Sequence, residues 1–98
     1  MPPHKSVLHL FGEVPRKVAA NLKKHGVSFA EAATAFADPL AAMLEDTVDP
    51  ERAILVGQPE KGRVLLVVFI EQAEDMIRTI SARRATSQER KRHEEGDW

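Results

Sequence analysis

An unbroken apolar run at 63–71, RVLLVVFIE, limits the folds open to this chain more than any other feature. Both alternating sets of its side chains are apolar, as is typical of a strand buried on both faces of a sheet. The turn sequences QPEKG and QAED flank the run and return the chain on either side. The run therefore predicts a central strand with a hairpin connection at each end.

Further strands are predicted on both sides of this central one. A short strand at 40–44 leads into an acidic turn, and a second strand follows at 52–57. After QAED the chain returns as a strand at 76–82. Because short turns join these strands in succession, we expect an antiparallel meander.

Helix signals precede and follow the strands. The first helix has Pro15 in its first turn and ends at Gly26, which suits the left-handed residue that closes a helix. A second helix begins at Ser28, which with Glu31 forms an S-x-x-E capping box. The pattern T-x-x-E opens a last helix at 87–95. The predicted fold class is α+β, an antiparallel sheet with two N-terminal helices and one C-terminal helix packed on it.

Length and composition indicate one ordinary globular module. The 98 residues leave no room for a second core, so we expect a single domain over 1–98. With 43% hydrophobic and 30% charged residues, the chain lies well away from disordered compositions. It has no cysteine, and its N-terminus is too polar for a signal peptide or a membrane span. We expect a soluble, cytoplasmic protein without membrane contact.

Charge is unevenly distributed along the chain. Residues 28–60 carry seven acids against one arginine, whereas residues 76–93 carry six Lys and Arg against one glutamate. Arginine matches phosphate oxygens, so the basic segment can hold RNA or dock an acidic partner. A solvated basic face is the structural alternative.

The strings KKHGVSFAEAATAFADPLA at 23–41, ERAILVG, GRVLLVVF and IRTISARRAT resemble the BrnT family of bacterial toxins over nearly the whole chain. The resemblance implies a RelE-like ribonuclease toxin fold. It also implies a toxin of a type II toxin-antitoxin system, an endoribonuclease that cuts RNA to inhibit translation and growth. A cognate, BrnA-like antitoxin would neutralise it in a hetero-oligomer that reaches DNA only through the antitoxin.

Cleaving RNA without metal needs a base for the 2′-hydroxyl, a cation for the phosphorane and an acid for the departing 5′-oxygen. His25 and Glu71 are candidate bases, since histidine as a residue type exchanges protons near neutral pH. A helix C-cap and a solvated strand end are their respective structural alternatives. In many BrnT proteins a tyrosine occupies the place of His93, which makes His93 a candidate acid. The remaining candidates are cations: Arg78 and Arg83 as catalytic residues, and Arg63, Arg84, Arg90 and Lys91 as RNA-binding residues.

Strand periodicity restricts which of these groups can act together. Arg78 and Arg83 have opposite parity, so they share a face only if a bulge or the end of the strand redirects Arg83. Arg63 and Glu71 stand at opposite ends of one strand and cannot reach one phosphate. Glu71 with Arg78 is the more coherent pair, because a short turn brings their strand ends together.

Metal and cofactor binding are not expected. The four histidines, His4, His9, His25 and His93, show no ligand spacing, and no glycine-rich nucleotide motif is present. Two functions remain open: a metal-independent endoribonuclease toxin, or a non-catalytic module that docks an antitoxin in a repressor complex. An inhibitor that covers a catalytic site would contact the same arginines, so charge alone does not separate them.

Overall fold

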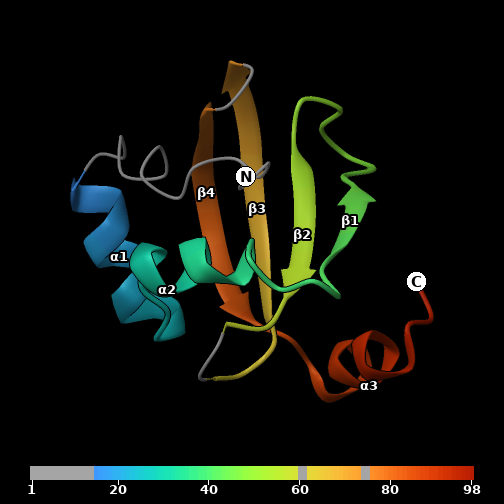
Figure 1. Cartoon of the computed structure of the whole chain (residues 1–98). Coiled ribbons are helices and arrows are strands. Elements are labelled where there is room, and N and C mark those ends of the chain that lie inside the picture. Colours follow the sequence, from blue (N-terminus) through green and yellow to red (C-terminus); the bar gives the residue numbers. More distant parts are fainter. Residues whose placement is uncertain (1–14, 60–61, 74–75) are drawn as a thin grey trace.

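Four antiparallel strands, paired in the order in which they occur in the sequence, form the sheet of this chain (Figure 1). The structure is a computed structural model, and it describes residues 15–59, 62–73 and 76–98. The strands are β1 (Ala42–Glu45), β2 (Ala53–Gly57), β3 (Leu65–Ala73) and β4 (Met76–Arg84). The predicted meander is therefore confirmed, and β1 and β4 form the two edges of the sheet.

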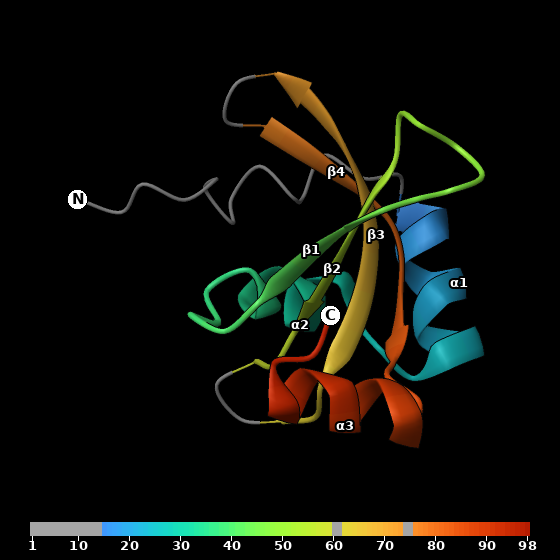
Figure 2. The same cartoon turned by 90° about the vertical axis from the view of Figure 1, so that its right-hand side faces the viewer.

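Three helices accompany the sheet, which confirms the α+β class. They are α1 (Pro15–His25), α2 (Phe29–Ala35) and α3 (Ser87–Glu95). Helix α1 packs on β4, and α2 crosses β4, β3 and β2. Figures 1 and 2 show α3 beyond the end of the sheet at which β3 begins and β4 ends. The helix layer thus covers one face of the sheet and does not extend over β1.

The core lies between this helix layer and the inward face of the sheet. Leu65, Val67 and Phe69 of β3 are each at most 1% exposed, and Phe36 packs edge-on against Phe69 with ring centroids 5.1 Å apart. The alternate residues of β3, on the outer face, are only half-buried. The expectation of burial on both faces is therefore wrong for the outer face, because no helix of the described residues packs across it.

A β-bulge in β4 decides which arginines share a face. Val68 of β3 pairs with Ser81 and Phe69 pairs with Thr79, so Ile80 has no partner opposite it. An extra residue in one strand shifts the alternation by one. Arg78 and Arg83 consequently both lie on the outer face, as the bulge alternative predicted.

Helix ends follow the predicted signals with one exception. Gly26 closes α1 at φ +69°, a conformation that glycine adopts without steric cost. The Ser28 hydroxyl accepts the amide of Glu31 at 2.9 Å. The Glu31 carboxylate, however, bonds to Arg63 instead of returning to the backbone, so this capping box is only half formed. The box before α3 is complete, with Thr86 and Glu89 bonded in both directions.

Candidate functional site

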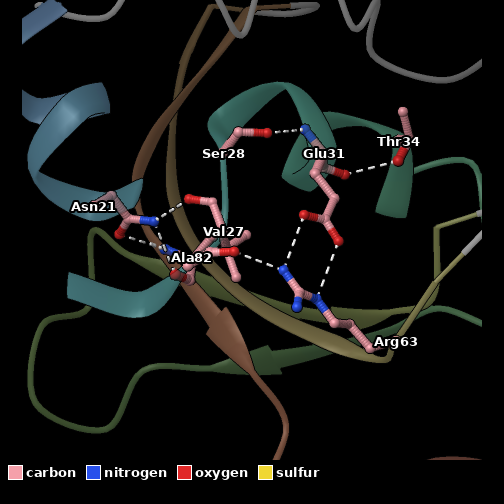
Figure 3. A network of polar contacts seen from close by, with 8 residues as sticks. Asn21, Val27, Ser28, Glu31, Thr34, Arg63 and Ala82 are labelled. Atoms are coloured by element: carbon pink, nitrogen blue, oxygen red, sulfur yellow. Dashed lines mark hydrogen bonds and ion pairs between the residues drawn. The ribbon is translucent and has the colours of Figure 1, made fainter. Parts of the chain in front are cut away.

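The structure uses Arg63 to hold the helices against the sheet. Its Nη2 donates to the carbonyl of Gly26 at 2.6 Å and to Glu31 Oε1 at 3.2 Å, while Nε donates to Glu31 Oε2 at 3.2 Å (Figure 3). These contacts join the start of β3 to the α1–α2 turn and to α2. Arg63 was predicted to bind RNA, but its guanidinium is hydrogen-bonded to Gly26 and Glu31. Arg63 is therefore not part of the candidate site.

Arg83 is likewise engaged, with Glu89 of α3. Its Nη1 and Nη2 donate to the two carboxylate oxygens of Glu89 at 2.9 and 3.0 Å. This bidentate contact lowers the pKa of Glu89 to about 2, against the opposing effect of burial, and the amide of Thr86 adds to the lowering. The pKa of Arg83 is raised by the same contact. The geometry assigns Arg83 to holding the first turn of α3, instead of the phosphate-binding role that was predicted.

The Arg83–Glu89 pair predicts a specific dependence of stability on pH. A carboxylate whose folded pKa lies below its unfolded value stabilises the fold above the unfolded pKa and loses this contribution as pH falls. For Glu89 the loss falls between pH 4.5 and about 2. Because the pair is partly solvated, we expect it to contribute about 1–2 kcal/mol to the free energy of unfolding. Urea unfolding across this range should show a larger loss of stability in the wild type than in Arg83→Ala, which keeps only the contribution of the Thr86 amide and of the other carboxylates.

A matched control is available on the same helix. Arg90→Ala breaks the exposed Arg90–Glu94 pair, whose atoms are 3.9 Å apart. It should leave the acid dependence unchanged, because exposed i,i+4 pairs contribute only a few tenths of a kcal/mol. Equal acid sensitivity of Arg83→Ala and the wild type would contradict the assignment.

His93 lies in the interior, where α3 meets the end of α2. Its side chain is 4% exposed, and Nε2 lies 3.2 Å from Oδ2 of Asp38, whose side chain is 10% exposed. Burial acts to raise the pKa of Asp38, but hydrogen bonds from the amides of Leu40 and Gln58 and from His93 outweigh it and lower the pKa. A side chain so enclosed is poorly placed to reach a substrate, and the role of His93 as general acid stays a prediction that this geometry does not support.

Glu71 and Arg78 lie close along the sheet but on different faces. Arg78 stands opposite Ile70, and Glu71 stands opposite Ile77. Directly opposed residues share a face and successive residues alternate. Arg78 therefore belongs to the outer face and Glu71 to the helix-covered face, beyond the helices. The two residues thus lie on different faces of the sheet, and a catalytic role for either stays a prediction.

The other RNA-binding candidates gather at the opposite end of β4. Arg84, Arg90 and Lys91 are all exposed, at the end of β4 and on α3. These basic side chains lie near the end of the sheet opposite to the end at which Glu71 lies. Their contact with RNA stays a prediction.

A groove between α1 and the edge strand β4 brings together His25 and two lysines. Its volume is about 270 Å³, and it is lined by Lys17, Ala20, Asn21, Lys24, His25, Ile80 and Ser81. Among the described residues that line it, none is Asp or Glu. We call it the α1–β4 groove. It combines two cations with a half-buried imidazole and so suits an anionic ligand.

Lys17 and Lys24 were missed as functional candidates, although the sequence carries a signal for them. Positions 17, 20, 21 and 24 follow the i, i+3, i+4, i+7 spacing of one helix face. That face of α1 has a lysine at each end and Asn21 between them. The pattern places both lysines beside the strand on which α1 packs.

Asn21 fixes α1 against the edge of β4 and thereby shapes the groove. Its Nδ2 donates to the carbonyls of Val27 and Ala82 at 2.8 and 2.9 Å, and its Oδ1 accepts the Ala82 amide at 3.1 Å (Figure 3). The residue is 7% exposed. One side chain thus sets the spacing between the helix and the strand that line the groove.

Residues suited to metal binding do not gather in the described ranges. Residues 15–59, 62–73 and 76–98 contain no group of three or more His, Asp or Glu able to hold one metal ion. His4 and His9 lie outside these ranges. Within the same ranges, no helix has the length and apolar character to cross a membrane.

An antiparallel sheet covered on one face by helices places the chain among small α+β proteins. A family model described as the ribonuclease toxin BrnT of type II toxin-antitoxin systems matches residues 14–89. The chain belongs to this BrnT family, and its place there supports a toxin role, a ribonuclease activity and an antitoxin partner.

A solved structure shares the fold. The 1.1 Å crystal structure of the Brucella abortus ribonuclease toxin BrnT superposes with a TM-score of 0.62 at 21% sequence identity. The match covers 76% of this chain and 92% of the Brucella chain. No curated protein matches the sequence. The structural likeness confirms the arrangement of helices and strands.

Proposed function

We propose that this chain is a metal-independent endoribonuclease toxin whose RNA site is the α1–β4 groove. The observation that carries the proposal is the meeting of Lys17, Lys24 and His25 in a groove without a lining acid. RNA brings one negative charge per nucleotide, and such a groove attracts it and binds its phosphates.

Each group of the groove has a chemical role in this proposal. His25 takes the proton of the 2′-hydroxyl, whose oxygen then attacks the neighbouring phosphorus. Lys17 and Lys24 stabilise the negative charge that accumulates on the phosphorane oxygens. The bond from phosphorus to the 5′-oxygen breaks, and that oxygen takes up a proton from Lys24, which lies beside His25. The products are a 2′,3′-cyclic phosphate and a 5′-hydroxyl.

Arg78 extends the site along the same strand. It precedes Ser81 of the groove by three residues, which is about 10 Å of strand. Neighbouring phosphates of single-stranded RNA lie within that range, so Arg78 binds the next phosphate along the backbone. The proposed site therefore follows the edge of β4 beside α1 and does not include Arg63, Arg83 or His93.

The family supports an antitoxin partner for this chain. In this proposal the chain is a single cytoplasmic domain over 1–98, and a BrnA-like antitoxin neutralises it in a hetero-oligomer. The complex binds DNA through the antitoxin, while the toxin alone acts on RNA.

The proposal is tested by the response of RNA binding and cleavage to loss of the two lysines. The Lys17→Ala/Lys24→Ala variant should lower the slope of log affinity against log salt by about 1.4, because each single-strand phosphate contact contributes about 0.7. RNA cleavage in EDTA should fall in parallel. Both are measured with purified, antitoxin-free protein.

Lys23→Ala is the matched control, since Lys23 is an exposed lysine of the same helix that does not line the groove. It should leave the salt slope and the cleavage rate near those of the wild type. A wild type that binds its antitoxin but leaves RNA intact would favour the non-catalytic binding module.

A further inference from the structure

Three of the large apolar side chains that the fold leaves exposed lie within nine residues around β1. Leu40 is 75% exposed, Met43 59% and Val48 90%. Small soluble proteins rarely leave several large apolar side chains exposed together without a binding role. None of the three takes part in the α1–β4 groove, which lies at the opposite edge of the sheet.

One of the three, Met43, also lines a second cavity. It has a volume of about 390 Å³ and is lined by Met43, Leu44, Glu45, Asp46, Pro50, Arg52 and Ala53. The cavity occurs where the helix layer ends, since α2 crosses β4, β3 and β2 and ends before β1 (Figure 1). We call Leu40, Met43, Glu45, Asp46, Val48 and Pro50 the β1 surface.

β1 also offers an unused strand edge. One of its edges pairs with β2, and within the described residues no strand pairs with the other. Edge strands accept an extended segment of another chain through main-chain hydrogen bonds. The exposed apolar side chains then pack against alternate side chains of that segment.

Charge around the β1 surface selects the occupant. Glu45 and Asp46 belong to it, Asp49 and Glu51 follow them in the same turn, and Arg52, the one Lys or Arg within residues 40–59, lies 3.4 Å from Asp49. Asp46 Oδ1 also accepts the amides of Val48 and Asp49 at 2.8 and 3.0 Å, which fixes the acidic turn. A second copy of this chain would oppose these carboxylates with the same carboxylates, which is unfavourable.

We propose that the β1 surface is the docking site of the antitoxin, and that it takes an extended antitoxin segment in which Lys or Arg side chains accompany apolar ones. The apolar side chains fill the cavity beside Met43, and the cations meet Glu45 and Asp46. The inference rests on the antitoxin partnership but not on RNA cleavage.

The test is the affinity of this chain for its purified cognate antitoxin, measured by calorimetry without RNA. Met43→Lys/Val48→Lys removes the two apolar contacts and places cations opposite cations. Both side chains are exposed in the free chain, so the fold should tolerate the change. We expect Kd to rise at least about thirtyfold, since each central interface contact is worth roughly 1 kcal/mol or more.

Leu22→Lys is the matched control, because Leu22 is 50% exposed and lies on α1, away from β1. It should bind the antitoxin within about threefold of the wild type. Equal affinity of the β1 variant and the wild type would overturn the proposal. So would a wild-type homodimer in sedimentation that the β1 variant converts to a monomer, because a second copy would then occupy the surface.

The outcome is separable from the ribonuclease proposal. If the β1 variant loses antitoxin binding while neither it nor the wild type cleaves RNA, the docking site stands and the enzyme assignment fails. If the variant cleaves RNA like the wild type and also binds the antitoxin normally, the docking site fails alone.

Discussion

Replacing Asn21 with alanine is expected to destabilise the fold by about 3 kcal/mol. The substitution removes three hydrogen bonds and leaves the Val27 carbonyl and both backbone groups of Ala82 without that partner. Buried polar groups without partners each cost about 1–3 kcal/mol. Thermal unfolding should show a fall in Tm of about 15 °C for a domain of this size.

Two further variants separate the hydrogen bonds from the volume of the side chain. Asn21→Asp keeps the shape but turns the donor that faces two carbonyls into an acceptor, so it should destabilise nearly as much as alanine. Leu22→Ala, at an exposed neighbouring position, should change stability by less than about 0.5 kcal/mol. A stable Asn21→Asp protein would show that the side chain acts through packing alone.

Replacing His25 with alanine is expected to lower the single-turnover rate of RNA cleavage by about 100-fold or more. In the proposed mechanism this imidazole takes the 2′-hydroxyl proton, whereas the lysines supply most of the RNA affinity. RNA binding should therefore change little while the rate falls. The rate is measured with RNA bound to excess enzyme, so that binding does not limit it.

Lys23→Ala serves again as the neighbouring control and should cleave at the wild-type rate. His25→Ala must also retain the wild-type Tm, because His25 ends α1. A variant that loses RNA affinity and rate together would assign His25 to binding instead of proton transfer.

Much of the fold could be predicted because local patterns determine it. The run at 63–71 identified the buried strand, and Gly26 and the T-x-x-E pattern marked helix ends that the structure reproduces. The strand before the acidic turn begins at Ala42, two residues later than predicted. The Leu40 amide donates a hydrogen bond to Asp38 Oδ1, which stabilises a turn before the strand.

The site could be predicted less well, because long-range pairing decides which charges are available. Arg63 is held by Glu31, 32 residues away, and His93 meets Asp38, 55 residues away. Neither pairing has a local signal. The bulge at Ile80 shifts the alternation of side chains along β4 by one residue. Strand parity alone therefore does not give the face on which Arg83 lies. Only the helical spacing of Lys17 and Lys24 could have located the groove.

The most direct test of the central claim is the chemistry of the RNA ends produced by the purified, antitoxin-free chain in EDTA. The account predicts fragments with 2′,3′-cyclic phosphate and 5′-hydroxyl ends, which become at least about 100-fold slower to form in folded His25→Ala. Fragments with 5′-phosphate ends, or cleavage by His25→Ala at the wild-type rate, would contradict catalysis in the α1–β4 groove.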